Sequence, residues 1–168
     1  MFKKSAIAML VLSLPLTASA NWSLGGGYIN LSDDSDGIDI SLGGLYGSAA
    51  YKYQLDNKKF SIVPELRLGT GVSDDTVHGV DVELERFIAL SVKGQYQVDE
   101  NINVFFMPSY ANAKLKASYN GHSESDDDWE FGVGAGLGYA FNEKAEAIVS
   151  YEQFDDTDVF SVGFSVSF

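Results

Sequence analysis

Residues 129–141 alternate strictly between two kinds of side chain, and this alternation constrains the fold more than any other feature of the sequence. The odd positions from Trp129 to Phe141 are all apolar, whereas the even positions between them hold four glycines, one alanine and one glutamate. Because successive side chains of a β-strand point to opposite faces, one face is wide and apolar and the other nearly bare. The pattern recurs in residues 60–69 and 160–168, which indicates a chain built from strands.

The small-residue face indicates which class of β protein these strands form. A soluble barrel or sandwich turns its apolar face inward and a charged face to water. The second face here is mostly Gly, Ser and Ala, which suits a narrow interior crowded by facing strands. The aromatic and aliphatic face then points outward into lipid, where only a closed barrel pairs every backbone group. A soluble, lipocalin-like barrel is the alternative.

Eight segments with this pattern predict an all-β fold, an eight-stranded antiparallel up-and-down transmembrane β-barrel. The predicted strands are Trp22–Leu31, Ile38–Leu55, Phe60–Val72, Val80–Gln97, Ile102–Ser118, Trp129–Phe141, Ala145–Phe154 and Val159–Phe168. Short turns alternate with mostly longer loops, as in barrels with periplasmic turns and extracellular loops. We expect irregular pairing at Gly43-Gly44, where the apolar phase slips, and at Pro64 and Pro108, which cannot donate to the ladder.

The first twenty residues have the composition of an export signal. A basic head at Lys3-Lys4 precedes an apolar stretch over residues 6–14, and Ala18-Ser19-Ala20 fits a small-x-small cleavage site. We therefore expect residues 1–20 to be a cleaved signal peptide and residues 21–168 to be one barrel domain of the bacterial outer membrane. A short membrane anchor is the alternative, although the apolar run is brief for one.

The net charge excludes one class of function. The chain carries 24 acidic residues against 11 Lys and Arg, a formal net charge of −13, so it lacks the basic face of a nucleic-acid-binding protein. The absence of Cys excludes zinc-thiolate and cysteine-nucleophile chemistry. The four longer loops hold many of the acids and neither Lys nor Arg. Weak divalent-ion binding and a solvated, repulsive rim are the two interpretations of these loops.

Several short segments resemble the OmpX/Ail family of small outer-membrane barrels. Gly25–Tyr28, and Ala50–Gln54 running into Asp56-Asn57, resemble its first hairpins. Three further segments resemble its third periplasmic hairpin: Gly134–Leu137, Asn142–Lys144 and Ser150–Gln153. The terminal Phe168 resembles the aromatic end that the barrel-assembly machinery reads. The resemblance implies a monomeric eight-stranded barrel and, in some members, adhesion to host cells or resistance to complement through the loops.

Charged residues on the inward phase predict a network inside the barrel. Eight strands leave an interior that side chains fill, and charges buried there must pair. The predicted members are Glu65, Arg67, Glu83, Glu85, Lys93, Glu130, Glu146 and Glu152. The expected partners of Arg67 are Glu65, Glu83, Glu85 and Glu130. The network is interpreted as structural, with an ion pathway as the alternative.

Three cations fall on the outward phase of two neighbouring strands. Arg86 lies on one strand and Lys114 and Lys116 on the next. Cations in lipid are costly unless they reach a polar interface, and Lys and Arg suit phosphate. The pattern predicts contact with lipopolysaccharide in the outer leaflet. The alternative is that the lysines lie above the membrane and only solubilise a protruding sheet.

The sequence as a whole predicts a structural or surface-interaction barrel with a packed lumen, without catalytic, cofactor or metal-binding residues. A lipid A-modifying outer-membrane enzyme and a narrow pore for small solutes are the alternatives. His122-Ser123-Glu124 invites a hydrolase interpretation, but three consecutive residues rarely converge as a triad does. The expected partners are outer-membrane lipid, lipopolysaccharide and the barrel-assembly machinery, and the sequence does not indicate what the loops bind.

Overall fold

The structure is a computed structural model that describes residues 21–168 except 36–37, 74, 78–79, 120–121 and 156. The predicted signal peptide therefore lies outside the described residues. Among those residues, no helix is long and apolar enough to cross a membrane. The strands are β1 (Trp22–Ser35), β2 (Ile38–Tyr51), β3 (Tyr53–Gln54), β4 (Phe60–Ser73), β5 (Asp75–Val77), β6 (Val80–Gln97), β7 (Ile102–Tyr119), β8 (His122–Ala140), β9 (Ala145–Phe154) and β10 (Thr157–Ser167).

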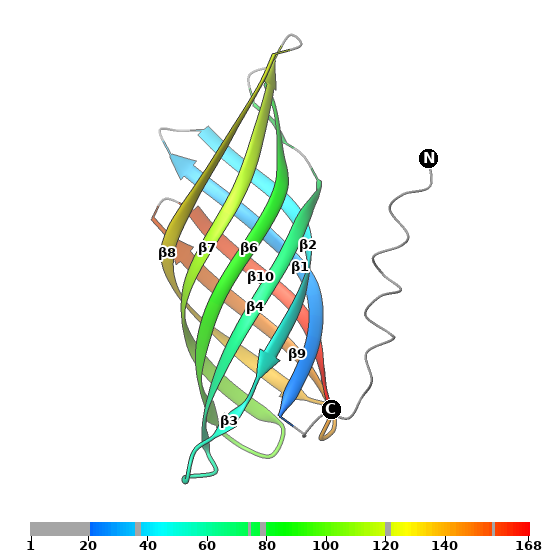
Figure 1. Cartoon of the computed structure of the whole chain (residues 1–168), viewed down its shortest axis with the longest axis vertical. Coiled ribbons are helices and arrows are strands. Elements are labelled where there is room, and N and C mark those ends of the chain that lie inside the picture. Colours follow the sequence, from blue (N-terminus) through cyan, green and yellow to red (C-terminus); the bar gives the residue numbers. More distant parts are fainter. Residues whose placement is uncertain (1–20, 36–37, 74, 78–79, 120–121, 156) are drawn as a thin grey trace, which may run out of the picture.

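The strands close into one antiparallel barrel (Figure 1). The sheet runs in the order β3-β4-β2-β1-β10-β9-β8-β7-β6-β5, and an additional pairing of β4 with β6 closes it. Two of the ten segments are short continuations: β3 extends β2 along β4, and β5 follows β4 along the outer part of β6. Eight strands thus form the barrel, and the predicted eight-stranded antiparallel up-and-down fold is confirmed.

The apolar face of the strands turns outward, as predicted. On β8, Phe131 is 65% exposed and Leu137 57% exposed, whereas Gly134 between them is buried. A Cβ atom at Gly134 would lie 2.6 Å from the backbone oxygen of Tyr151, so only glycine fits this close approach to the neighbouring strand. The outward face supplies the apolar band that lipid requires.

Exposed aromatic side chains gather at both ends of the apolar band. Tyr110 and Trp129 stack with ring centroids 5.0 Å apart near one end. Three other ring pairs lie near the opposite end, where the short turns and the C terminus are: Trp22–Tyr51, Phe60–Tyr96 and Tyr139–Phe141. Such girdles mark the two interfaces of an outer-membrane barrel, and the short turns mark the periplasmic one. We call the Tyr110–Trp129 end the outer end.

The predicted irregularities fall where the sequence places them. The β2–β4 register shifts between Gly43 and Gly44, which confirms the expected bulge. Pairing along β2 stops after Ala50 and resumes at β3, opposite the position of Pro64. The β6–β7 ladder likewise skips the position of Pro108. Each proline interrupts one of its two ladders because it lacks an N–H donor.

A second bulge, at Glu85 in β6, was not predicted from the sequence. The β6–β7 register shifts between Leu84 and Arg86. The residues of β6 that face inward are therefore even-numbered before the shift and odd-numbered after it. Leu84 is 3% exposed and Phe87 is 1% exposed, and both face inward. A β-bulge adds one residue to one strand of a pair and rotates the side chains beyond it. The prediction that Glu83 and Glu85 face the lumen is therefore wrong.

The outer hairpins are longer than predicted. Residues 119–128 were expected to form a loop, but β8 begins at His122 and pairs with β7 as far as Tyr119↔His122. Figure 1 shows the β7–β8 hairpin rising above the other strands, at the end opposite the C terminus. The acidic segment is therefore carried on an extended two-stranded sheet.

Candidate functional sites in the lumen and on the outer wall

The centre of the lumen is closed by one bidentate ion pair. Arg67 on β4 donates from its two terminal nitrogens to the carboxylate of Glu152 on β9, at 2.5 and 2.7 Å. The two side chains are 2% and 0% exposed. Paired N–H···O bonds between a planar guanidinium and a carboxylate fix both groups geometrically. Because β4 and β9 lie in different parts of the barrel wall, this contact spans the interior.

Hydroxyl groups extend this pair into a network. Ser91 on β6 accepts from Arg67 at 3.0 Å, and Ser109 on β7 donates to Glu152 at 2.6 Å. Ser91 in turn donates its hydroxyl proton to Ser109 at 2.9 Å, because the single Ser109 proton is engaged with Glu152. These buried hydroxyls satisfy oxygen and nitrogen atoms that would otherwise remain unpaired in the interior. Neither serine was predicted to belong to the network, although both occupy the inward phase of their strands.

A second ion pair lies beside the first. Lys93 on β6 forms a close ion pair with Glu65 on β4, and Glu65 also approaches the Arg67 side-chain nitrogen Nε at 3.5 Å. The Phe87 ring lies 5.7 Å from the Arg67 guanidinium, and the Phe105 ring lies 5.1 Å from the Lys93 ammonium. The ring faces attract the cations. Charges, hydroxyls and rings together fill the middle of the barrel.

The structure brings four of the eight predicted lumen residues together: Glu65, Arg67, Lys93 and Glu152. The main partner of Arg67 is Glu152, which was not among the four acids expected to pair with it. Glu146 lies apart and accepts from Asn103 at 2.5 Å, and Glu130 lines a cavity near the outer end. Glu83 and Glu85 lie on the outer wall, beyond the bulge.

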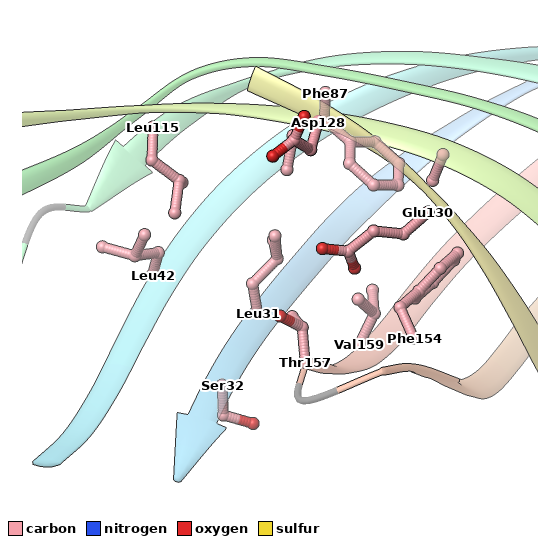
Figure 2. A pocket seen from close by; sticks show the side chains of 12 residues that line it. Leu31, Ser32, Leu42, Phe87, Leu115, Asp128, Glu130, Phe154, Thr157 and Val159 are labelled. Carbon is pink, nitrogen blue, oxygen red and sulfur yellow. The ribbon is translucent and has the colours of Figure 1, made fainter. Parts of the chain in front are cut away.

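The outer half of the lumen is apolar. Buried residues from six strands form one hydrophobic cluster there: Ile29, Leu31, Leu42, Leu84, Phe87, Ala89, Ala111, Phe154 and Val159. Above it lies a cavity of about 160 Å³, and Figure 2 shows Leu31, Leu42 and Val159 lining it together with Asp128 and Glu130. The polar network therefore closes the barrel on its periplasmic side. The hydrophobic cluster and its cavity lie on the outer side, and we call them together the apolar cup.

The three cations predicted to contact lipopolysaccharide lie together on the outer wall, next to acids. Lys114 pairs with Glu85 at 2.8 Å and Lys116 with Glu83 at 2.7 Å. Arg86 donates to the Asn112 side-chain oxygen at 3.0 Å. Lys114 and Lys116 thus have carboxylate partners within the protein, and lipopolysaccharide contact stays a prediction.

This charged group lies beyond the outer aromatic band. Trp129 of that band lies opposite Asn112 in the β7–β8 ladder. Lys114, which lies opposite Arg86 in the β6–β7 ladder, is two residues further outward. The hydrogen bond from Lys114 lowers the pKa of Glu85. The hydrogen bond to Glu83 raises the pKa of Lys116. Both shifts favour the charged forms, so the two ion pairs persist at neutral pH.

The remaining candidates concern chemistry and assembly. His122, Ser123 and Glu124 stand at the start of β8, and their side chains lie outside what the structure describes. Among the described residues, no group of three or more His, Cys, Asp or Glu side chains is placed to hold a metal ion.

Phe168 donates its backbone N–H to the Trp22 carbonyl at 3.0 Å, where the last and first strands meet. Its role as an assembly signal stays a prediction.

Comparison with known proteins gives a consistent result. Residues 5–168 match the family described as outer membrane protein beta-barrel domain. No protein of established annotation matches the sequence closely enough to count as a relative. The expected resemblance to OmpX/Ail-type barrels agrees with the solved structures that match.

Three solved structures of similar fold illustrate the likeness. Ail, the attachment invasion locus protein of Yersinia pestis in complex with the heparin analogue sucrose octasulfate, has a TM-score of 0.66 and 18% identity, covering 90% of this chain and 100% of Ail. Neisserial surface protein A has a TM-score of 0.62 and 12% identity, covering 88% and 97%. The N-terminal β-barrel domain of Pseudomonas aeruginosa OprF has a TM-score of 0.61 and 15% identity, covering 90% and 100%. At these identities the likeness concerns the fold.

Proposed function

Because the chain belongs to the family of outer-membrane β-barrel domains and is a bacterial outer-membrane protein, we propose that it is a closed barrel that presents its outer hairpins for interaction at the cell surface. The observation that supports a closed lumen is the Arg67–Glu152 pair, whose two side chains are 2% and 0% exposed. An eight-stranded barrel has an interior just wide enough for side chains to fill. A structural network there favours this role over a solute pore.

The closed lumen is tested by conductance. The refolded barrel is inserted into planar bilayers, beside two variants, Arg67→Ala and Ser61→Ala. The wild-type barrel and Ser61→Ala should show no conductance above an empty bilayer, because Ser61 lies outside the Arg67 network. Conductance that appears only in Arg67→Ala would identify the Arg67–Glu152 pair as the contact that closes the lumen. Discrete, reproducible conductance steps from the wild-type barrel would establish the pore alternative and refute a closed lumen.

The partner of the outer hairpins is proposed to be cationic or neutral. Ail was solved with a sulfated heparin analogue, which is a polyanion. In this chain the outermost segment of β8 carries Glu124, Asp126, Asp127 and Asp128 and neither Lys nor Arg. An acidic surface repels polyanions and steers cations toward it. The shared fold thus supports a surface role, and the charge of this chain favours a partner of opposite sign.

Charge neutralisation at one end of the barrel tests this proposal. In the test variant, Glu124, Asp126, Asp127 and Asp128 are replaced by Gln or Asn. The matched control makes the same change in net charge at the periplasmic turns, at Asp56, Asp99, Glu100 and Glu143. The barrel in neutral-lipid nanodiscs is passed over immobilised poly-lysine and immobilised heparin.

The wild-type barrel and the control should be retained on poly-lysine in a salt-dependent manner, and the test variant should be retained much less. None should bind heparin at physiological ionic strength. Equal retention of test variant and control would mean that the hairpin does not present this charge. Retention on heparin would contradict the proposed sign of the partner.

We further propose that the protein is not an enzyme and acts as a monomer. The sequence supports the first part, because His122-Ser123-Glu124 are three consecutive residues, and consecutive residues rarely converge as the members of a triad do. A lipid A-modifying enzyme would change the mass of lipid A in cells that overproduce the protein. Mass spectra of lipid A should therefore be identical with and without overproduction.

A further inference from the structure

The outer half of the lumen holds a cavity that a structural network does not account for. It measures about 160 Å³. Its wall is formed by buried apolar side chains, including Leu31, Leu42 and Val159, with Phe87 toward the ion-pair network. The interior of outer-membrane barrels is ordinarily polar. An apolar wall reached by water is unfavourable, and an apolar group that covers it is stabilised.

Small side chains on one strand create the space. Ala111 and Ala113 occupy successive inward positions of β7, and both line the cavity. The next inward residue, Leu115, also lines it. A leucine in place of either alanine would extend into the cavity. The hollow is therefore a property of these residues, and a single substitution is able to fill it.

Two carboxylates reach the same cavity. Asp128 and Glu130 are two residues apart on β8, so their side chains share a face. Figure 2 shows the Glu130 carboxyl group between Leu31, Phe154 and Val159, and Asp128 beside Phe87. Both acids are exposed, and they are the charged side chains among the described residues that line the cavity. The cavity thus combines an apolar wall with negative charge.

We propose that this cavity binds a small organic cation, a single aromatic ring or short alkyl chain that carries an ammonium group. The size follows from volume, because an apolar cavity of about 150 Å³ holds benzene. The charge follows from the two carboxylates. The ring or chain lies against Leu31, Leu42 and Val159, and the ammonium group lies beside Asp128 and Glu130. This site shares Asp128 with the acidic segment of β8, but its ligand is a small molecule and it needs no macromolecular partner.

Binding is measured on the refolded barrel in detergent micelles, with alanine methyl groups labelled for NMR. Three probes share one ring and differ in charge: 2-phenylethylammonium, neutral 2-phenylethanol and anionic 3-phenylpropanoate. The Ala111 and Ala113 methyl groups report the cavity. The Ala135 methyl group, which is exposed on the lipid-facing side of β8, reports partitioning of the probe into detergent.

Four variants, two of them matched controls, separate the contributions of charge and space. Asp128→Asn with Glu130→Gln removes the cavity charge, and Glu100→Gln with Glu143→Gln removes the same charge at the periplasmic end. Ala113→Leu fills the cavity, and Ala135→Leu adds the same volume on the lipid-facing wall.

The proposal predicts saturable shifts of Ala111 and Ala113 with the cation, at an affinity roughly five- to tenfold above that of the alcohol, as two solvent-exposed charge contacts provide. The cavity-charge variant should lose that preference and the periplasmic variant should keep it. Ala113→Leu should abolish the shift of the Ala111 methyl group, and Ala135→Leu should leave that shift unchanged.

Two results would overturn the proposal. Equal affinities for the cation and the alcohol would show that the carboxylates take no part. Shifts that do not saturate, or that appear equally at Ala135, would show that the probe enters the micelle and not the cavity.

Discussion

Arg67 is the side chain on which the stability of the lumen depends most. Its replacement by Met leaves the carboxylate of Glu152 buried and without its bidentate partner. Breaking a buried ion pair in this way costs about 3 to 5 kcal/mol. We expect Arg67→Met to lower the free energy of unfolding by that amount, measured by urea titration of the refolded barrel in lipid. Adding Glu152→Gln should recover part of the loss, because the orphaned charge is removed.

Arg86 provides the matched control for this substitution, because it is the other arginine of the chain and is exposed. Arg86→Met should cost about 1 kcal/mol or less, as exposed polar contacts do. If the two substitutions proved equally mild, Arg67 would have to be reached by water, and the lumen would not be closed.

At the scale of the single strand, the alternation of side chains was enough to predict which face meets lipid. The number of strands and the bulge at Gly43-Gly44 were also predictable, because each leaves a signal in the period-two pattern. The bulge at Glu85 was not, since Val82 and Leu84 have the same parity as the lipid-facing residues beyond it. Phe87, a large apolar residue on the opposite parity, is the one sequence signal that could have revealed it.

The candidate site was predictable only in part, for a related reason. Inward phase identified Arg67, Glu65, Lys93 and Glu152 as lumen residues, but phase does not give the height of a residue in the barrel. Glu152 lies opposite Arg67 only because of the stagger of strands far apart in the sequence. The length of β8 was missed because its acidic start has low strand propensity, and pairing with β7 overrides that preference.

Two glycines test the assignment of strand faces with the same substitution. Gly134 on β8 faces inward, and a Cβ atom there would meet the Glu152 side chain at 2.5 Å and the Tyr151 carbonyl at 2.6 Å. Gly94 on β6 is exposed, and its nearest neighbour would be the Phe106 carbonyl at 3.9 Å. We expect Gly134→Ala to destabilise the barrel by about 1 to 3 kcal/mol through overpacking.

Gly94→Ala should instead be neutral or stabilise the barrel by about 0.4 to 1 kcal/mol, because alanine reduces the freedom of the unfolded chain. Unfolding midpoints in lipid measure both effects. If Gly94→Ala destabilised the barrel and Gly134→Ala had no effect, the assignment of inward and outward faces would be the wrong way round.

At the scale of the whole molecule, the last residue helps to join the first and last strands of the barrel. Phe168 contributes one backbone hydrogen bond to Trp22, so its removal should reduce stability in detergent only slightly. If it also serves as the assembly signal, its removal should lower the amount of barrel in the outer membrane much more. Immunoblots of membrane fractions and unfolding curves measure the two quantities, and Phe168→Tyr should restore the membrane level. Equal membrane levels of truncated and full-length chains would refute the signal.

The outer wall gives a prediction about lipopolysaccharide. Replacing Arg86, Lys114 and Lys116 by Gln should reduce the thermal stabilisation that added lipopolysaccharide gives the refolded barrel. Replacing Glu83 and Glu85 by Gln should increase it, because Lys114 and Lys116 are then released from their carboxylate partners. Equal stabilisation of wild type and both variants would place lipopolysaccharide elsewhere on the barrel.

The bulge at Glu85 has a consequence for how this protein is able to change. Below it the even-numbered side chains of β6 meet lipid, and above it the even-numbered side chains line the cup. Deleting one residue there would exchange the two sets for the whole outer part of β6, so Val82 and Leu84 would leave the cup while Glu83 entered it. Substitutions outward of the bulge, by contrast, meet water and not hydrocarbon. The bulge therefore divides the strand into a part fixed by the membrane and a part free to diversify, and new surface specificities are expected to arise above it.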